Sequence, residues 1–151
     1  EAQTYADQLA PGTTKHRPTQ VVEAQFSVPF LVAAALALGR VGIGEVAEVN
    51  DARVLALAAR IQGEVRADAP KGWAALTVRR TDGRLASRET TTPSGSPTQP
   101  LSTVQLEMKF RDCAAHAVRP LHAAVVAQLL STVQHLDTLP TVTDLLQLLQ
   151  P

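Results

Sequence analysis

The sequence has one cysteine, few aromatic residues and no excess of charge of either sign. Cys113 has no second cysteine to pair with, which excludes an internal disulfide and a metal site with several cysteines. Fourteen basic and fourteen acidic residues balance, so the net charge gives no indication of binding to nucleic acid or to an anionic membrane. No targeting segment is visible, and together with the lone cysteine this favours a reducing compartment. We therefore expect a cytoplasmic protein.

Aromatic residues make up 3% of the chain, so its core has to be built from alanine, valine and leucine. The 151 residues are 45% hydrophobic, which is typical of one globular domain. Small side chains bury little area each, and we expect the chain to depend on a partner surface or to form an oligomer. It starts at Glu1 without an initiator methionine, and we expect an excised or processed piece of a longer protein.

The longest apolar run predicts a helix from about Val28 to Leu38, ended by Gly39. It is too short to cross a membrane, which takes about 20 residues. Because the run is apolar all round, we expect the helix to be buried on every face. Its polar front end, Gln25 to Ser27, is where chemistry would lie.

Other local signals predict a β-hairpin and further helices. The Asp82-Gly83 turn joins two alternating runs, Trp73–Arg80 and Arg84–Thr92. A second helix should run from Asn50 or Asp51 to about Ile61, and a short strand is expected within Glu1–Leu9. After the loop Pro93–Pro100 the pattern becomes helical, with segments at Ser102–Ala115, Leu121–Leu136 and Thr143–Leu149 separated in part by Pro120. This order predicts an α+β fold, with helices packed on a short antiparallel sheet, followed by C-terminal helices.

The chain offers no clear catalytic constellation. Gly39–Gly44 follows a helix rather than a strand, so a phosphate-binding loop is disfavoured. The histidines lack the spacing of metal ligands, and no metal site is predicted. Cys113 could be a nucleophile with His116 one turn away, although a small buried cysteine on a helix is the commoner arrangement.

Lys15-His16-Arg17 places positive donors just before the polar end of the predicted helix. Such donors could bind a carboxylate by charge-assisted hydrogen bonds near a helix N-terminus. The same run could instead be a solvated loop, which is the commoner role of charged runs.

A series of short motifs runs in order through nearly the whole chain. They are Glu23–Phe30 (EAQFSVPF) before an alanine-rich helix ending at Gly39-Arg40-Val41, then Asp51–Leu55 (DARVL), Asp82-Gly83, Gly95–Pro97, Pro100–Ser102 and Lys109–Arg111. Each motif is weak alone. Their order and spacing resemble the MmgE/PrpD family, which includes 2-methylcitrate dehydratase, cis-aconitate decarboxylase and iminodisuccinate epimerase.

The resemblance implies the C-terminal portion of a protein about three times this length. Residues 1–105 would be a small α+β domain that covers the active site, and residues 106–151 would be helices that return to a large helical domain. Family members are homodimers that dehydrate, decarboxylate or epimerise small polycarboxylates by acid–base chemistry, without a metal or a nicotinamide cofactor.

The same resemblance places the catalytic histidine, lysine and aspartate residues in the large domain. No catalytic residue is therefore assigned in this chain, and we expect it to be inactive alone. The expected substrate contacts are Lys15, Arg17, Gln25 and Ser27, and the Gln25–Phe30 segment is expected to face the substrate cleft. Some relatives have tyrosine where this chain has Phe30, so a phenolic donor would be missing there. A non-catalytic binding or assembly module, and an unrelated helical domain without a hairpin, are the alternatives.

Overall fold

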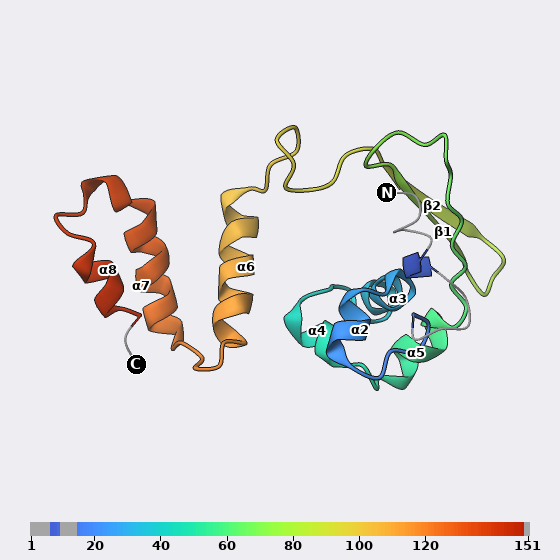
Figure 1. Ribbon diagram of the computed structural model, residues 1–151, viewed down its shortest axis with the longest axis horizontal. Coiled ribbons are helices and arrows are strands. Elements are labelled where there is room, and N and C mark those ends of the chain that lie inside the picture. Colours follow the sequence, from blue (N-terminus) through green and yellow to red (C-terminus); the bar gives the residue numbers. More distant parts are fainter. Residues whose placement is uncertain (1–6, 10–14, 150–151) are drawn as a thin grey trace.

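The computed structural model of the chain describes residues 7–9 and 15–149. Figure 1 shows an elongated molecule with three parts: a group of helices, a β-hairpin, and a row of C-terminal helices. We call residues 15–61 the lobe and residues 103–149 the tail. The lobe contains α2 (Val21–Gln25), α3 (Val28–Leu38), α4 (Ile43–Ala47) and α5 (Ala52–Ala58). The hairpin consists of β1 (Ala74–Arg79) and β2 (Leu85–Thr90), and the tail contains α6 (Thr103–Ala115), α7 (Ala123–Gln134), the 3₁₀ helix η1 (Leu136–Thr138) and α8 (Thr143–Gln147).

The prediction for α3 is confirmed at both ends. Ser27 is its N-cap and accepts a hydrogen bond from the backbone N–H of Phe30, while a proline lies in the first turn. Gly39 follows the last turn with φ of 82°, a left-handed conformation that glycine adopts without steric cost.

Burial of α3 on every face is wrong. One face, formed by Pro29, Phe30, Ala33 and Ala34, is buried, whereas Leu36 on the other side is 44% exposed. The lobe contains too few helices to surround α3, because α5 packs along one side and α2 and α4 make shorter contacts. An apolar strip of α3 is thus left uncovered within the described residues.

The core of the lobe is made almost entirely of small side chains, as the composition predicts. Its buried residues are Ala24, Phe30, Ala33, Ala34, Val46, Val49, Val54 and Ala58. Phe30 is the largest of them, and partly buried leucines and an isoleucine close the edges. Small residues allow α3 and α5 to approach closely along their length.

The β-hairpin is confirmed, which excludes the helical alternative for this segment. Its strands pair antiparallel from Ala74 opposite Thr90 to Arg79 opposite Leu85. The Gly83 N–H bonds the Arg80 carbonyl, and Gly83 itself has φ of 84°, as in a type I turn followed by a glycine bulge. Most of the strand side chains are exposed, so the hairpin projects from the helices (Figure 1).

In the tail, α6 begins after Ser102, whose side chain accepts from the Gln105 N–H, as predicted from the capping-box pattern. Three further details differ from expectation. The short helices α2 and α4 were not predicted, and α5 ends at Ala58 rather than near Ile61. Residues 7–9 are helical, while residues 1–6 of the expected first strand lie outside the described residues.

No helix in the described ranges combines the length and the apolar character that crossing a bilayer requires.

Candidate functional site

Two of the four expected substrate contacts, Lys15 and Ser27, are joined to each other. The Ser27 hydroxyl donates to the Lys15 carbonyl, and its oxygen also accepts from the Phe30 N–H at 3.0 Å. Lys15 Nζ in turn donates to the Phe26 carbonyl at 2.7 Å. Ser27 is fully buried. This serine therefore ties the connector before α2 to the start of α3, and its hydroxyl is already used within the chain.

Arg17 and Gln25, the other two expected contacts, are exposed, and within the described residues no hydrogen bond or ion pair joins them to each other. The neighbouring His16 turns toward the lobe, where its Nε2 lies 3.0 Å from the Ile61 carbonyl. Its Nδ1 is buried without a hydrogen-bond partner among the described residues. The side chains of the basic run thus differ in direction. Arg17 faces solvent, while Lys15 and His16 make bonds to other residues of the lobe.

Phe30 does not face a cleft in this structure. It is fully buried among the lobe helices, on the same face of α3 as Ala33 and Ala34. The expectation that the whole Gln25–Phe30 segment faces a cleft is therefore wrong at Phe30.

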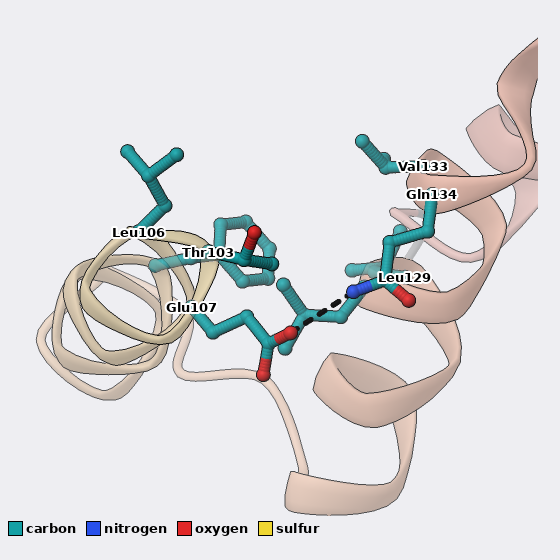
Figure 2. A pocket seen from close by; sticks show the side chains of 8 residues that line it. Thr103, Leu106, Glu107, Leu129, Val133 and Gln134 are labelled. Atoms are coloured by element: carbon teal, nitrogen blue, oxygen red, sulfur yellow. Dashed lines mark hydrogen bonds between the residues drawn. The ribbon is translucent and has the colours of Figure 1, made fainter. Parts of the chain in front are cut away.

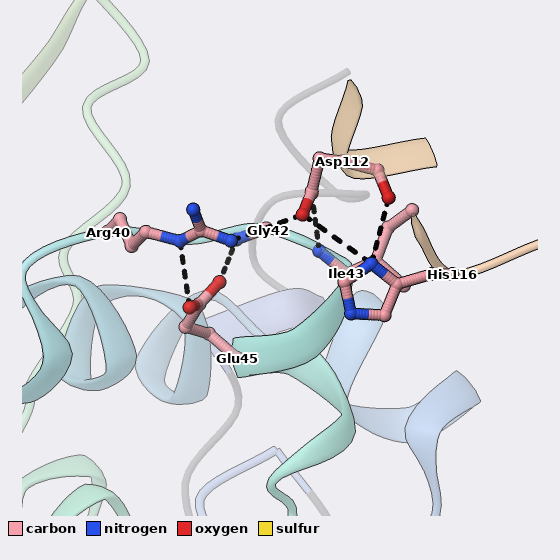
Figure 3. Close-up of polar contacts among 6 residues, drawn as sticks. All are labelled: Arg40, Gly42, Ile43, Glu45, Asp112 and His116. Carbon is pink, nitrogen blue, oxygen red and sulfur yellow. Dashed lines mark hydrogen bonds and ion pairs between the residues drawn. The ribbon is translucent and has the colours of Figure 1, made fainter. Parts of the chain in front are cut away.

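A cluster of charged side chains, which the sequence did not reveal, lies between α4 and α6 (Figure 3). Arg40 donates from Nε to Glu45 at 2.8 Å and from Nη2 to Asp112 at 3.2 Å. Asp112 also accepts from the backbone N–H of Ile43 at 3.2 Å, and His116 Nδ1 lies 3.5 Å from its other oxygen. We call these five residues the Asp112 cluster.

Electrostatics keep both carboxylates of the Asp112 cluster ionised. The hydrogen bond from the Ile43 N–H, with the nearby charges of Arg40 and His116, lowers the pKa of Asp112. Hydrogen bonds from the Arg40 side chain lower the pKa of Glu45 in the same way. A general base works best with a pKa near the working pH, so these carboxylates suit a structural role rather than proton transfer.

The Asp112 cluster was missed because its members are far apart in the sequence. Glu45 accepts from the Gly42 N–H at 2.9 Å, and that local bond could have been inferred from the spacing of Gly42 and Glu45. Asp112 lies 69 residues beyond Ile43, and no local pattern indicates that pairing.

A second feature is an apolar groove of about 280 Å³ between α6 and α7 (Figure 2). A hydrogen bond of 2.9 Å from Gln134 to Glu107 crosses it. The lining residues are Thr103, Leu106, Glu107, Phe110, Leu129, Leu130, Val133 and Gln134. Such a lining offers few donors to a polycarboxylate and is typical of a surface that packs against protein.

Neither metal binding nor cysteine catalysis gains support from the geometry. In the described part of the chain, no three histidine, cysteine, aspartate or glutamate residues gather as a metal site would require. Cys113 is exposed, so the expectation of a small buried cysteine is wrong. Exposure alone does not activate a thiol, because an activating environment is also needed.

Comparison with known protein families identifies a match over most of the chain. The family described as MmgE/PrpD C-terminal domain matches residues 1–134, a span that includes the lobe, the hairpin, α6 and α7. No curated protein matches the chain.

Proposed function

The chain belongs to the MmgE/PrpD family, and from that premise we propose that it is the C-terminal part of a lyase or isomerase. The enzyme would dehydrate, decarboxylate or epimerise small polycarboxylates by acid–base chemistry in the cytoplasm. The family match over residues 1–134 is the observation that carries the proposal. We propose that the catalytic acids and bases come from a large helical domain, and that the chain alone is inactive.

We propose that residues 1–105 cover the active site and that residues 106–151 pack against the large domain. Exposed apolar side chains in the tail support this arrangement, since the groove between α6 and α7 needs a packing partner. A homodimer would cover further apolar surface, such as the uncovered strip of α3.

Arg17 and Gln25 are the proposed direct contacts with substrate, because their exposed side chains can reach a carboxylate from the lobe surface. For Lys15 and Ser27 we propose a supporting role, since their bonds to Phe26, Phe30 and each other hold the segment that carries Gln25.

Turnover assays with 2-methylcitrate, cis-aconitate and iminodisuccinate test the proposal. The isolated chain should turn over none of them, and the longer gene product that contains it should turn over one. In that product Arg17→Ala and Gln25→Ala should raise KM with little change in kcat, because they remove binding rather than chemistry. Arg119→Ala, at an exposed arginine between α6 and α7, is the matched control and should change neither constant.

A non-catalytic binding or assembly module is the second candidate. It is favoured by the burial of Phe30 and Ser27, which removes two side chains from the segment expected to meet substrate. Absence of turnover in the longer product with all three substrates would support this module. Turnover by the isolated chain would contradict the proposal that its catalytic groups lie elsewhere.

A further inference from the structure

The lobe and the tail meet at the Asp112 cluster. Helix α6 contacts α7 and has no comparable contact with a helix of the lobe, and the C-terminal end of α6 is the part that approaches α4. There, the polar contacts of α6 with the lobe converge on the Asp112 carboxylate, which accepts from both Arg40 and the Ile43 N–H (Figure 3).

Two glycines of the lobe, Gly42 and Gly44, make room for the side chains of α6 and its C-cap at this contact. A Cβ on Gly42 would lie 2.8 Å from Asp112 Oδ2, and a Cβ on Gly44 would lie 3.2 Å from His116 Nε2. Gly42 has φ of −135°, which any residue can adopt, so its requirement for glycine is one of space rather than of backbone conformation. Gly42 and Gly44, which belong to the run disfavoured as a phosphate-binding loop, thus leave room for the Asp112 and His116 side chains.

Asp112 also completes the N-terminus of α4. The first N–H groups of a helix have no partner within the helix, and Glu45 accepts only the one from Gly42. Asp112 accepts the next, from Ile43, although it belongs to a different helix. Its carboxylate thus acts as a helix cap supplied from α6.

We propose that Asp112 is the joint that fixes the angle between the lobe and α6. The hydrogen bond from the Ile43 N–H contributes more to holding this angle than the ion pair to Arg40 does. Exposed ion pairs contribute little because water and salt screen them, and the Arg40 side chain is 57% exposed. A carboxylate that accepts a helix N–H is directional, which suits a joint. That this joint sets the position of a cover over an active site rests on the proposed function, whereas the joint itself does not.

Two measurements on the full 151-residue chain test the joint. The first is amide hydrogen exchange at Ile43, which should become about fivefold faster in Asp112→Ala because a cap bond is lost. The Val54 amide, capped by Asp51 within its own segment, is the internal control and should not change. The second is the spin-label distance between Ala56→Cys and Lys109→Cys, both at exposed positions, in a Cys113→Ser background.

A single narrow distance distribution is expected in the parent chain, and a broad one in Asp112→Ala. Gly42→Ala should broaden it too, since the added methyl displaces the carboxylate without removing a charge. Asp112→Asn keeps an acceptor for the Ile43 N–H, so its distance distribution should be nearly as narrow as that of the parent chain. Asp137→Ala, at an exposed aspartate in η1, is the control for loss of one negative charge.

The charge-exchanged pair, Arg40→Asp with Asp112→Arg, separates the two contacts. It restores an ion pair but offers no acceptor to the Ile43 N–H, so the broad distribution should remain. A narrow distribution in that pair would overturn the leading role of the cap, and an unchanged distribution in Asp112→Ala would overturn the joint. Far-UV circular dichroism identifies variants that fail to fold, and neither measurement depends on turnover.

Discussion

Phe26 and Phe30 belong to the same motif, four positions apart, but have opposite environments. Phe30 is fully buried in the lobe core, whereas Phe26 is 57% exposed. We expect Phe30→Ala to lower the free energy of unfolding by about 3–5 kcal/mol, because it leaves a cavity in a core with few large side chains. Phe26→Ala should cost less than about 1 kcal/mol.

Urea unfolding followed by circular dichroism measures both values. Similar losses in the two variants would contradict the assignment of Phe30 to the core.

Asp51 gives the lobe a dependence on pH. The Arg53 side chain, at 2.6 Å, and then the backbone N–H groups of Arg53 and Val54 lower the pKa of Asp51 from 3.8 to about 2. A carboxyl with a lowered pKa in the folded state stabilises the fold above its unfolded value and loses that contribution as the pH falls. The free energy of unfolding should therefore decrease between pH 4 and pH 2.

Urea unfolding at a series of pH values tests this, with Arg53→Gln as the comparison. That variant removes the side-chain hydrogen bond with the largest effect, so its decrease over the same range should be smaller. Equal acid sensitivity in the two proteins would show that other carboxylates are responsible.

At the scale of elements, the end of α3 depends on one glycine. Gly39 has φ of 82°, and a Cβ there would meet no atom within 4 Å, so a substitution is opposed by backbone conformation alone. Gly39→Ala should destabilise the lobe by about 1 kcal/mol. Asparagine tolerates this conformation better, so Gly39→Asn should cost less. Thermal unfolding ranks the three proteins, and equal stability of glycine and alanine would contradict the argument.

Elements with local signals could be predicted from the sequence. Helix α3 has a serine before it and a glycine after it, the hairpin has Asp82-Gly83, and α6 has Ser102 with Gln105. The short helices α2 and α4, of five residues each, are too brief to show a helical period. Helix α4 also takes its cap from Asp112, a contact that depends on the tertiary fold.

The candidate site follows the same division between local and distant contacts. Lys15 and Ser27 lie in two local polar runs that the sequence shows, and the structure joins them across twelve residues. Which way each side chain turns was not predictable, because it depends on how α3 packs against α5. The Asp112 cluster joins residues about seventy positions apart and left no sequence signal.

At the scale of the whole molecule, exposed apolar side chains favour association. Val104 and Met108 lie one turn apart on α6 and are 65% and 62% exposed. We expect the chain to sediment as a dimer or larger species at micromolar concentration, and Val104→Glu with Met108→Glu to shift it toward monomer. Arg119→Glu changes the net charge by the same amount at an exposed position and should leave association unchanged. A monomeric parent chain would contradict the proposal of a homo-oligomer.

The narrow connection between lobe and tail also has a kinetic consequence. Helices α3 and α5 pack together and are close in the sequence. Contacts between segments that are close in the sequence form fast. The core of the lobe can therefore form on the ribosome before α6 has been synthesised, and Asp112 caps α4 afterwards. It can also open without the tail, so amides of α5 and α7 should report different opening free energies in native-state hydrogen exchange. The chain would then unfold as two cooperative units, and the free energies of unfolding expected above for Phe30→Ala and for the Asp51 pH series would be those of the lobe.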